Sequence, residues 1–222
     1  VQLSIGIWLF REQSVVASSW AIGGFEAKSI AYVFLFASLY FFISQRELFA
    51  SICLGLCFSF HPAIGLSGGL AVGISILFMR YPLKKILWMA GLVILFALPG
   101  AIPVFQVLQA SSGGPVDIWQ FIVLTHSPHH FDPSSWHRRA ILFLYFMMLF
   151  NFLHARLHKD NDGFRFLLYF QLALCALFTL GVGLRITEQY SFLRFFPFRL
   201  FSLLTPFFFS FQLMHAFHYR AK

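Results

Sequence analysis

The chain is poor in charged residues, and in acidic ones above all. Only 8 of its 222 residues are Asp or Glu, against 16 Lys or Arg, and charged residues make up 11% of the sequence. Residues 48–79, 86–116 and 166–184 carry no formal charge. Because soluble globular domains contain about 25% charged residues, this composition excludes an ordinary soluble domain.

Cysteine is scarce as well. Three cysteines are too few for a disulfide framework. Cys53 and Cys57 lie one helical turn apart in an apolar run, and Cys175 lies in another, so we expect packed thiols. The chain also lacks a signal-peptide pattern, and residues 1–10 resemble the end of an apolar segment. We therefore expect a fragment of a longer protein whose N-terminal part is missing.

Apolar residues are what the chain has in excess. Hydrophobic residues make up 59% of it, Phe alone accounts for 32 positions, and the mean hydropathy is +0.77. A transmembrane helix needs about 20 apolar residues to cross about 30 Å of hydrocarbon. We therefore predict an all-α fold, a single polytopic transmembrane helical bundle over residues 1–222 with about seven membrane segments, at 28–45, 48–60, 63–79, 86–108, 139–157, 164–184 and 198–218.

Some of these segments are expected to be short or kinked. A helix over 48–60 reaches only about 20 Å at 1.5 Å per residue. Pro62 favours a turn or kink, and we prefer a hairpin with His61 and Pro62 at its tip over one long helix through 48–79. Pro99 and Pro103 are expected to fray or kink the end of segment 86–108.

The net charge of +8 does not indicate a nucleic-acid partner. Much of it lies at helix ends, where Lys and Arg anchor to headgroups and set orientation. Nine basic residues fall on one side of the predicted bundle, which we take as cytoplasmic: Arg46, Arg80, Lys84, Lys85, Arg156, Lys159, Arg165, Arg220 and Lys222. The partner this implies is the lipid bilayer, and we expect a bacterial inner membrane.

The densest polar cluster runs from Thr125 to His137 and should face the opposite side. It holds four His and one Asp within a short stretch. Imidazoles and carboxylates bind divalent ions, so a divalent metal is one interpretation, although the spacing matches no standard zinc motif. Phosphate binding, proton transfer and a solvated interfacial loop are the alternatives. The candidate metal ligands are His126, His129, His130 and Asp132.

Five further polar residues lie at the ends of predicted segments. His61 either faces a cleft or caps a helix, because an ionisable group between apolar runs is costly otherwise. Glu26 and Lys28 precede a segment, where an acid either does chemistry or simply favours the helix start. Arg199 opens the last segment, and Arg185 ends the one before it. Arginine suits phosphate recognition, with snorkelling to headgroups as the alternative.

These pieces together resemble the GT-C superfamily of polytopic glycosyltransferases, which use polyprenyl-phosphate sugars. The resemblance rests on residues 24–28 before a segment, Phe60-His61-Pro62, residues 128–133 in a loop, and residues 196–199 opening the last segment. It covers most of the chain and is architectural. The family's catalytic acid commonly lies in a first extracytoplasmic loop, so the assignment of that acid here is open between Glu26 and Asp132, with Asp117 a distant third.

The resemblance implies inverting glycosyl transfer from a polyprenyl-phosphate lipid at an extracytoplasmic site. Glu26 or Asp132 would then be catalytic, and the substrate-binding residues would be Lys28, His61, His129, His130, Arg185 and Arg199. A transporter or flippase for an anionic lipid and a structural subunit of a membrane complex are the competing interpretations. Another group of histidines, His154, His158, His215 and His218, has helical spacing; we place it at the interface beside Lys and Arg rather than around a haem.

Overall fold

The computed structural model describes residues 27–110, 117–193 and 198–220. Every regular element in these ranges is helical, which confirms the all-α prediction. The described helices form two compact units, an N-terminal unit over residues 27–110 and a C-terminal unit over residues 117–193 and 198–220. A single transmembrane domain over 1–222 stays a prediction.

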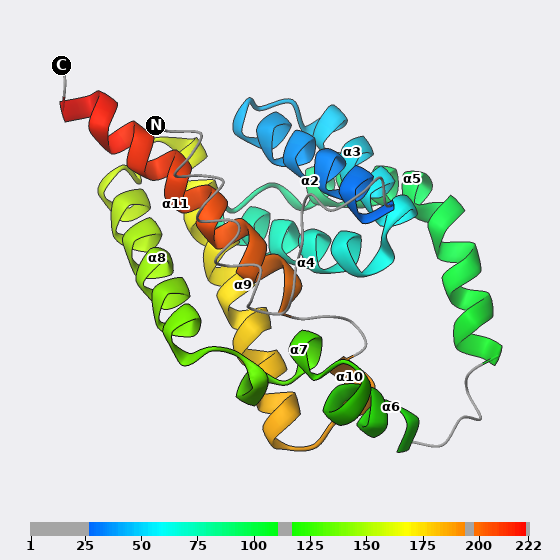
Figure 1. Ribbon diagram of the computed structural model, residues 1–222. Coiled ribbons are helices and arrows are strands. Elements are labelled where there is room, and N and C mark those ends of the chain that lie inside the picture. Colours follow the sequence, from blue (N-terminus) through cyan, green and yellow to red (C-terminus); the bar gives the residue numbers. More distant parts are fainter. Residues whose placement is uncertain (1–26, 111–116, 194–197, 221–222) are drawn as a thin grey trace. The chain divides into compact units, whose positions relative to one another are not determined.

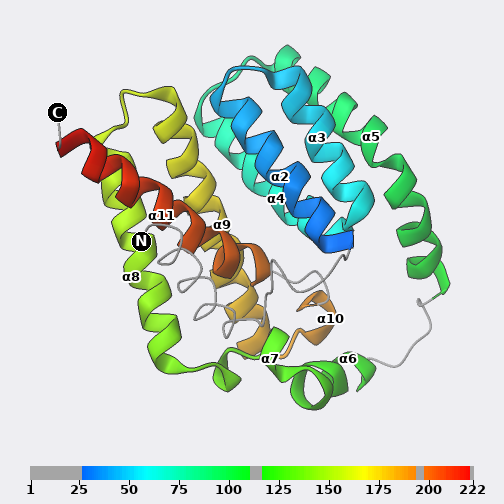
Figure 2. The same ribbon diagram turned by 45° about the horizontal axis from the view of Figure 1, so that its top comes forward.

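The N-terminal unit contains four helices, shown from blue to green in Figures 1 and 2: α2 (Ala27–Ile43), α3 (Glu47–Phe60), α4 (Pro62–Phe78) and α5 (Leu83–Ala110). Helix α3 packs closely against α2 and α5. The close approach to α5 requires glycine, because a Cβ on Gly100 would lie 2.5 Å from Ser59 Cα, and one on Gly55 would lie 2.6 Å from Val93 O. Ser59 Oγ also donates a hydrogen bond to Phe96 O over 2.6 Å.

The break at His61 is present where the sequence predicts it. Helix α3 ends at Phe60, His61 is extended with φ −150° and ψ 96°, and Pro62 is the first residue of α4. Helix α4 turns back along α3 (Figure 2), so a hairpin forms and not one long helix. Pro99 and Pro103 lie inside α5, which continues to Ala110 and does not fray, but the helix changes direction along its length (Figure 1).

The C-terminal unit is built on three long helices, α8 (Arg138–Leu157), α9 (Asp162–Ile186) and α11 (Arg199–Arg220). Buried aromatic rings fill the space between them, with Phe178 only 4.8 Å from Phe201 and 5.3 Å from Phe198 between ring centroids. Asn151 Nδ2 donates to Thr205 O over 3.0 Å and joins α8 to α11. Short elements cover one end of the bundle: α6 (Asp117–Phe121), a π-helical turn η1 (Ile122–His126), α7 (Pro128–Phe131), a 3₁₀ turn η2 (Pro133–Ser135) and α10 (Tyr190–Leu193).

Four of the helices are long and apolar enough to cross a membrane: Leu83–Gln106, Arg138–Leu157, Asp162–Ile186 and Arg199–Phe217. In the first of these helices, only 6% of an 18-residue apolar stretch is buried inside the protein. An apolar helix surface that the protein leaves uncovered is typical of lipid contact. The remaining apolar helices, α2, α3 and α4, have 17, 14 and 17 residues. A membrane protein is therefore indicated, while the count of about seven segments is not established by helix length.

Three helices end in the same backbone motif without glycine. Gln45, Arg80 and Glu188 each have φ of 58°, the left-handed region that glycine occupies most readily. After α9, Glu188 N–H donates to Arg185 O and Gln189 N–H donates to Leu184 O, which is the Schellman pattern. This motif turns the chain sharply just after Arg185.

Candidate functional site

The best-formed polar group of the C-terminal unit is the ion pair between Asp132 and Arg185. Arg185 Nη2 donates to Asp132 Oδ2 over 3.1 Å, across 53 residues of sequence. The carboxylate side chain is 11% exposed and the guanidinium side chain 22%. Asp132 follows α7 and lies in the loop of residues 126–137, which we call the capping loop. Arg185 lies in the last turn of α9, so the pair ties the capping loop to the end of a long helix.

Both carboxylate oxygens of Asp132 accept hydrogen bonds from neighbouring residues. Its Oδ1 atom accepts a hydrogen bond from Ser134 N–H over 3.0 Å and thereby caps η2, while Oδ2 accepts from Arg185. Burial acts to raise the carboxyl pKa, but the hydrogen bonds from Arg185 and Ser134 and the positive charge of Arg185 outweigh it and hold the pKa below its usual value. The group is therefore ionised at neutral pH, and it is better placed to position Arg185 than to accept a proton.

Arg185 retains a buried donor. Its Nε atom is enclosed and has no hydrogen-bond partner within the described part of the chain. Tyr190 lies beside the guanidinium, with 5.5 Å from Cζ to the ring centroid. A buried donor without an acceptor is costly, and an anionic oxygen would satisfy it. Because Nε is enclosed, such a ligand requires the Arg185 side chain to turn or the capping loop to shift.

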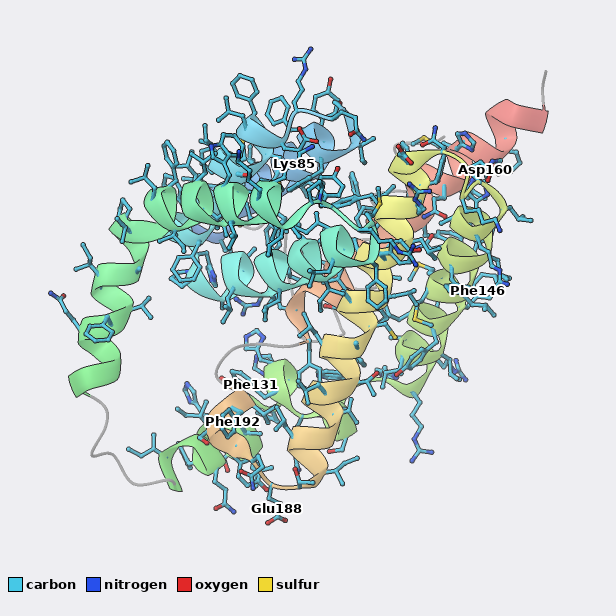
Figure 3. The ribbon with its side chains drawn as sticks, turned by 180° about the vertical axis from the view of Figure 1, so that it is seen from behind. Lys85, Phe131, Phe146, Asp160, Glu188 and Phe192 are labelled. Carbon is cyan, nitrogen blue, oxygen red and sulfur yellow. The ribbon has the colours of Figure 1, made fainter. Side chains whose placement is uncertain are left out.

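Trp136 anchors the loop that carries Asp132. Its side chain is 5% exposed, its Nε1 donates to His129 O over 2.8 Å, and its ring lies 5.0 Å from Phe198. Ser135 Oγ donates to Asp132 O over 2.7 Å. The loop is thus fixed from within and from the helices below, which gives the ion pair a rigid frame. Figure 3 shows Phe131, Phe192 and Glu188 at this end of the unit and Asp160 at the other.

The ligand atoms of His126, His129 and His130 in the capping loop do not converge on one point as they would in a metal centre. His126 and His129 are exposed and His130 is half-buried, with the rings of His129 and His130 at 4.3 Å. Their ligand atoms do not meet with Asp132 in a group of three, as far as the described residues go. The residues proposed as metal ligands therefore lie on one loop without sharing one point, and metal binding there stays a prediction.

Arg199 lies at the same end of the unit. It is the first residue of α11 and is half-buried, and the preceding Phe198 packs against Trp136. Asp132, His129, His130, Arg185 and Arg199 are thus gathered over one end of the three-helix bundle.

The other predicted site residues lie elsewhere. Lys28 is in the first turn of α2, and His61 is between α3 and α4, both in the N-terminal unit. His61 Nδ1 accepts from Ile64 N–H over 3.4 Å, as a cap of α4, which agrees with the helix-cap alternative. Glu26 lies outside the described residues.

The structure also brings together three of the four histidines that the sequence predicts at the membrane interface. His154, His158 and His215 have ligand nitrogen atoms all within 4.8 Å of one another, and they form the only group of three or more potential metal ligands found among the described residues. His154 is 7% exposed, and His158 and His215 are half-buried. The spacing of His154 and His158 was visible in the sequence, but the approach of His215 depends on the packing of α8 against α11.

The N-terminal unit has a cavity of about 280 Å³ of a different kind. It is lined by apolar side chains and by glycines of α4, with Ser51 as the one polar side chain among its lining residues. It offers no convergent set of reactive groups. No family model matches the chain, and neither a curated protein nor a solved structure does.

Proposed function

We propose that this protein is an integral protein of the bacterial inner membrane that binds the phosphate of a polyprenyl-phosphate sugar at the Arg185 end of the C-terminal unit and acts as a glycosyltransferase. The observation that carries the proposal is the half-buried Arg185, which is held by Asp132 at the end of an apolar helix and retains an unpaired buried donor.

The membrane arrangement in this proposal includes the shorter helices. Helices of 17 and 14 residues reach about 26 and 21 Å, which suits a thin or locally thinned bilayer. Together with the four long helices, α2, α3 and α4 then give seven membrane segments. The Asp132 end is extracytoplasmic, because Arg156, Lys159 and Arg165 lie at the opposite end of α8 and α9.

Arg185 and Arg199 are suited to the phosphate. Arginine donors match phosphate oxygens in geometry and charge, and they stabilise the negative charge that grows on a departing phosphate. Asp132 holds the Arg185 guanidinium and is therefore a positioning residue. His129 and His130, exposed and half-buried on the same loop, are placed to orient the phosphate or the sugar.

The transfer step needs one further group. The acceptor hydroxyl oxygen attacks the anomeric carbon, the bond from that carbon to the phosphate oxygen breaks, and the lipid phosphate leaves with the bonding electrons. The hydroxyl proton passes to a carboxylate. Both oxygens of Asp132 are engaged by Ser134 and Arg185, so Asp132 positions Arg185 and the base is another carboxylate.

Two measurements on the full chain in proteoliposomes test the proposal. Native mass spectrometry measures binding of a polyprenyl phosphate, and a product assay with a panel of polyprenyl-phosphate sugars measures transfer. We expect Arg185→Gln to lose both, and Arg185→Lys, which keeps the charge but not the planar fork, to bind more weakly than the wild type. Arg139→Gln, which removes an exposed charge at the same end, should retain both.

The outcomes separate the competing functions. Binding that depends on Arg185 without transfer to any acceptor favours a transporter or flippase for an anionic lipid. Binding that is unchanged in Arg185→Gln contradicts the proposal and leaves a structural subunit of a membrane complex as the better interpretation.

A further inference from the structure

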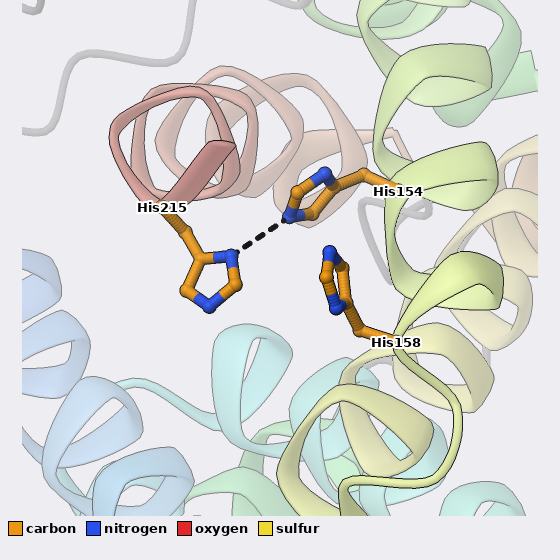
Figure 4. Close-up of side chains that lie close together, drawn as sticks. All are labelled: His154, His158 and His215. Atoms are coloured by element: carbon orange, nitrogen blue, oxygen red, sulfur yellow. Dashed lines mark hydrogen bonds between the residues drawn. The ribbon is translucent and has the colours of Figure 1, made fainter. Parts of the chain in front are cut away.

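The histidine cluster of the C-terminal unit has a geometry that the proposed glycosyl transfer does not use. His154 lies in the last turn of α8, His158 follows α8 one turn later, and His215 comes from α11 (Figure 4). The imidazoles lie at the end of α8 away from Asp132, about 30 Å along a helix of 20 residues. This cluster is therefore a separate feature.

The distances between the nitrogens are close to those of a metal site. His154 Nε2 lies 3.2 Å from His215 Nδ1, and all three histidines offer ligand atoms within 4.8 Å of one another. Zn–N bonds of about 2.0–2.1 Å in a tetrahedral site place ligand nitrogens about 3.4 Å apart. The closest pair already has this spacing, and rotations of the imidazole rings would close the remaining gap.

The contact between His154 and His215 has a chemical consequence. Two imidazole nitrogens at 3.2 Å form a hydrogen bond only when one of them carries a proton. A metal ion that binds both of these nitrogens requires that proton to move to the other nitrogen of the same ring. Metal binding at this site therefore replaces the hydrogen bond between His154 and His215, and neutral imidazoles bind the ion without a net release of protons.

The surroundings of the cluster favour a cation and restrict water on one side. Phe164 is buried and contacts all three imidazoles, with centroid distances of 5.7, 5.3 and 4.7 Å to His154, His158 and His215. Phe150 stacks on His154 at 5.9 Å. In addition, the carbonyl end of α8 carries partial negative charge.

The turn between α8 and α9 keeps this arrangement in place. Asn161 Oδ1 accepts from Gly163 N–H over 2.9 Å and from Phe164 N–H over 3.3 Å, and Asn161 N–H donates to His158 O over 3.0 Å. The same residue thus fixes the backbone at His158 and the start of the helix that carries Phe164. Preorganised ligands lose less conformational freedom on binding.

We propose that His154, His158 and His215 form a binding site for one divalent transition-metal ion, with Zn²⁺ as the reference ion. Imidazole ligands suit Zn²⁺, Cu²⁺ and Ni²⁺. Three protein ligands leave a fourth coordination position for water or another small ligand, as in catalytic zinc sites.

The test uses the full chain in nanodiscs, freed of metal by a chelator. Isothermal titration with Zn²⁺ and elemental analysis after desalting are measured together. We expect one Zn²⁺ per chain. His158→Gln and His215→Gln should each weaken binding at least about 100-fold, since even the loss of a group that only orients a ligand costs 10–100-fold.

The control removes the loop histidines instead, in the variant His126→Ala, His129→Ala and His130→Ala. This variant should bind Zn²⁺ as the wild type does. Zn²⁺ should also raise the melting temperature of the wild type and the control but not of His215→Gln, whose metal-free melting temperature shows that it is folded. Loss of binding in the loop variant alone, or equal binding in all variants, would overturn the proposal.

Discussion

Arg185 Nη2 donates to Asp132 Oδ2 over 3.1 Å and so ties the capping loop to the last turn of α9. The two residues are far apart in sequence and both are largely buried. This contact creates the site that we assign to the phosphate, because it holds a guanidinium at the end of an apolar helix. It also gives the loop a stability that depends on pH.

The first prediction concerns that dependence on pH. The carboxyl pKa of Asp132 is lowered in the folded protein despite its burial, because Arg185 and Ser134 stabilise the ionised form. Its contribution is therefore complete above the ordinary carboxyl pKa of about 3.9 and is lost as the pH falls through the lowered value. We expect Asp132→Asn to cost about 1–3 kcal/mol at pH 7.

Thermal unfolding of the wild type and of Asp132→Asn in detergent between pH 3 and pH 8 measures this difference in stability. The gap in melting temperature should be constant above about pH 5 and should shrink below about pH 4. A gap that is the same at every pH would show that the charge of Asp132 does not act as described.

The second prediction concerns Trp136, which fixes the loop. Trp136→Ala removes a buried ring and should destabilise the protein by about 3–5 kcal/mol. Trp136→Phe keeps most of the packing and leaves His129 O without its donor, which should cost about 1 kcal/mol. Trp88→Ala serves as the control, since Trp88 is 51% exposed. Chemical denaturation in detergent measures all three, and equal effects of Trp136→Ala and Trp88→Ala would refute the anchoring role.

The third prediction uses two glycines of the same helix. A Cβ on Gly100 would lie 2.5 Å from Ser59 Cα, whereas one on Gly91 meets nothing within 4 Å. Backbone atoms cannot move aside cheaply, so Gly100→Ala should destabilise the N-terminal unit by about 1–3 kcal/mol. Gly91→Ala should be neutral or slightly stabilising. If both variants unfold at the same denaturant concentration, the close contact of α3 with α5 is wrong.

The fourth prediction concerns the end of α9. Glu188 is exposed and has φ of 58°, a conformation that costs a residue with a Cβ about 1–2 kcal/mol. Glycine removes this cost and adds freedom to the unfolded chain, so Glu188→Gly should stabilise by about 0.5–1 kcal/mol. Thr187→Gly, at a position with φ −85°, should destabilise instead. Melting temperatures of the two variants should therefore move in opposite directions.

The positions of the helices could be predicted from the sequence, because the apolar runs are long and charge-free. The expected segment 164–184 corresponds to α9 at Asp162–Ile186, and 139–157 corresponds to α8 at Arg138–Leu157. Of the fraying or kinking expected at Pro99 and Pro103, the fraying is absent, since α5 continues through both prolines, whereas the helix does change direction along its length (Figure 3). A proline inside a helix removes one hydrogen bond, and its ring clashes with the carbonyl four residues earlier, so it can bend a helix without ending it.

The site could be predicted only in part. Asp132 and Arg185 were recognised as unusual, but their pairing depends on how the capping loop folds over α9. The partner of His154 is 61 residues away on another helix, and no local pattern gives that contact. Trp136 and Tyr190 were missed because an aromatic residue in an aromatic-rich chain carries little signal of its own.

The most direct test of the central claim is a cryo-EM structure of the full protein in lipid with a polyprenyl phosphate added. The account predicts phosphate density within hydrogen-bond distance of the Arg185 guanidinium, with the capping loop in place over α9. Phosphate density elsewhere, with Arg185 bound to Asp132 alone, would contradict it.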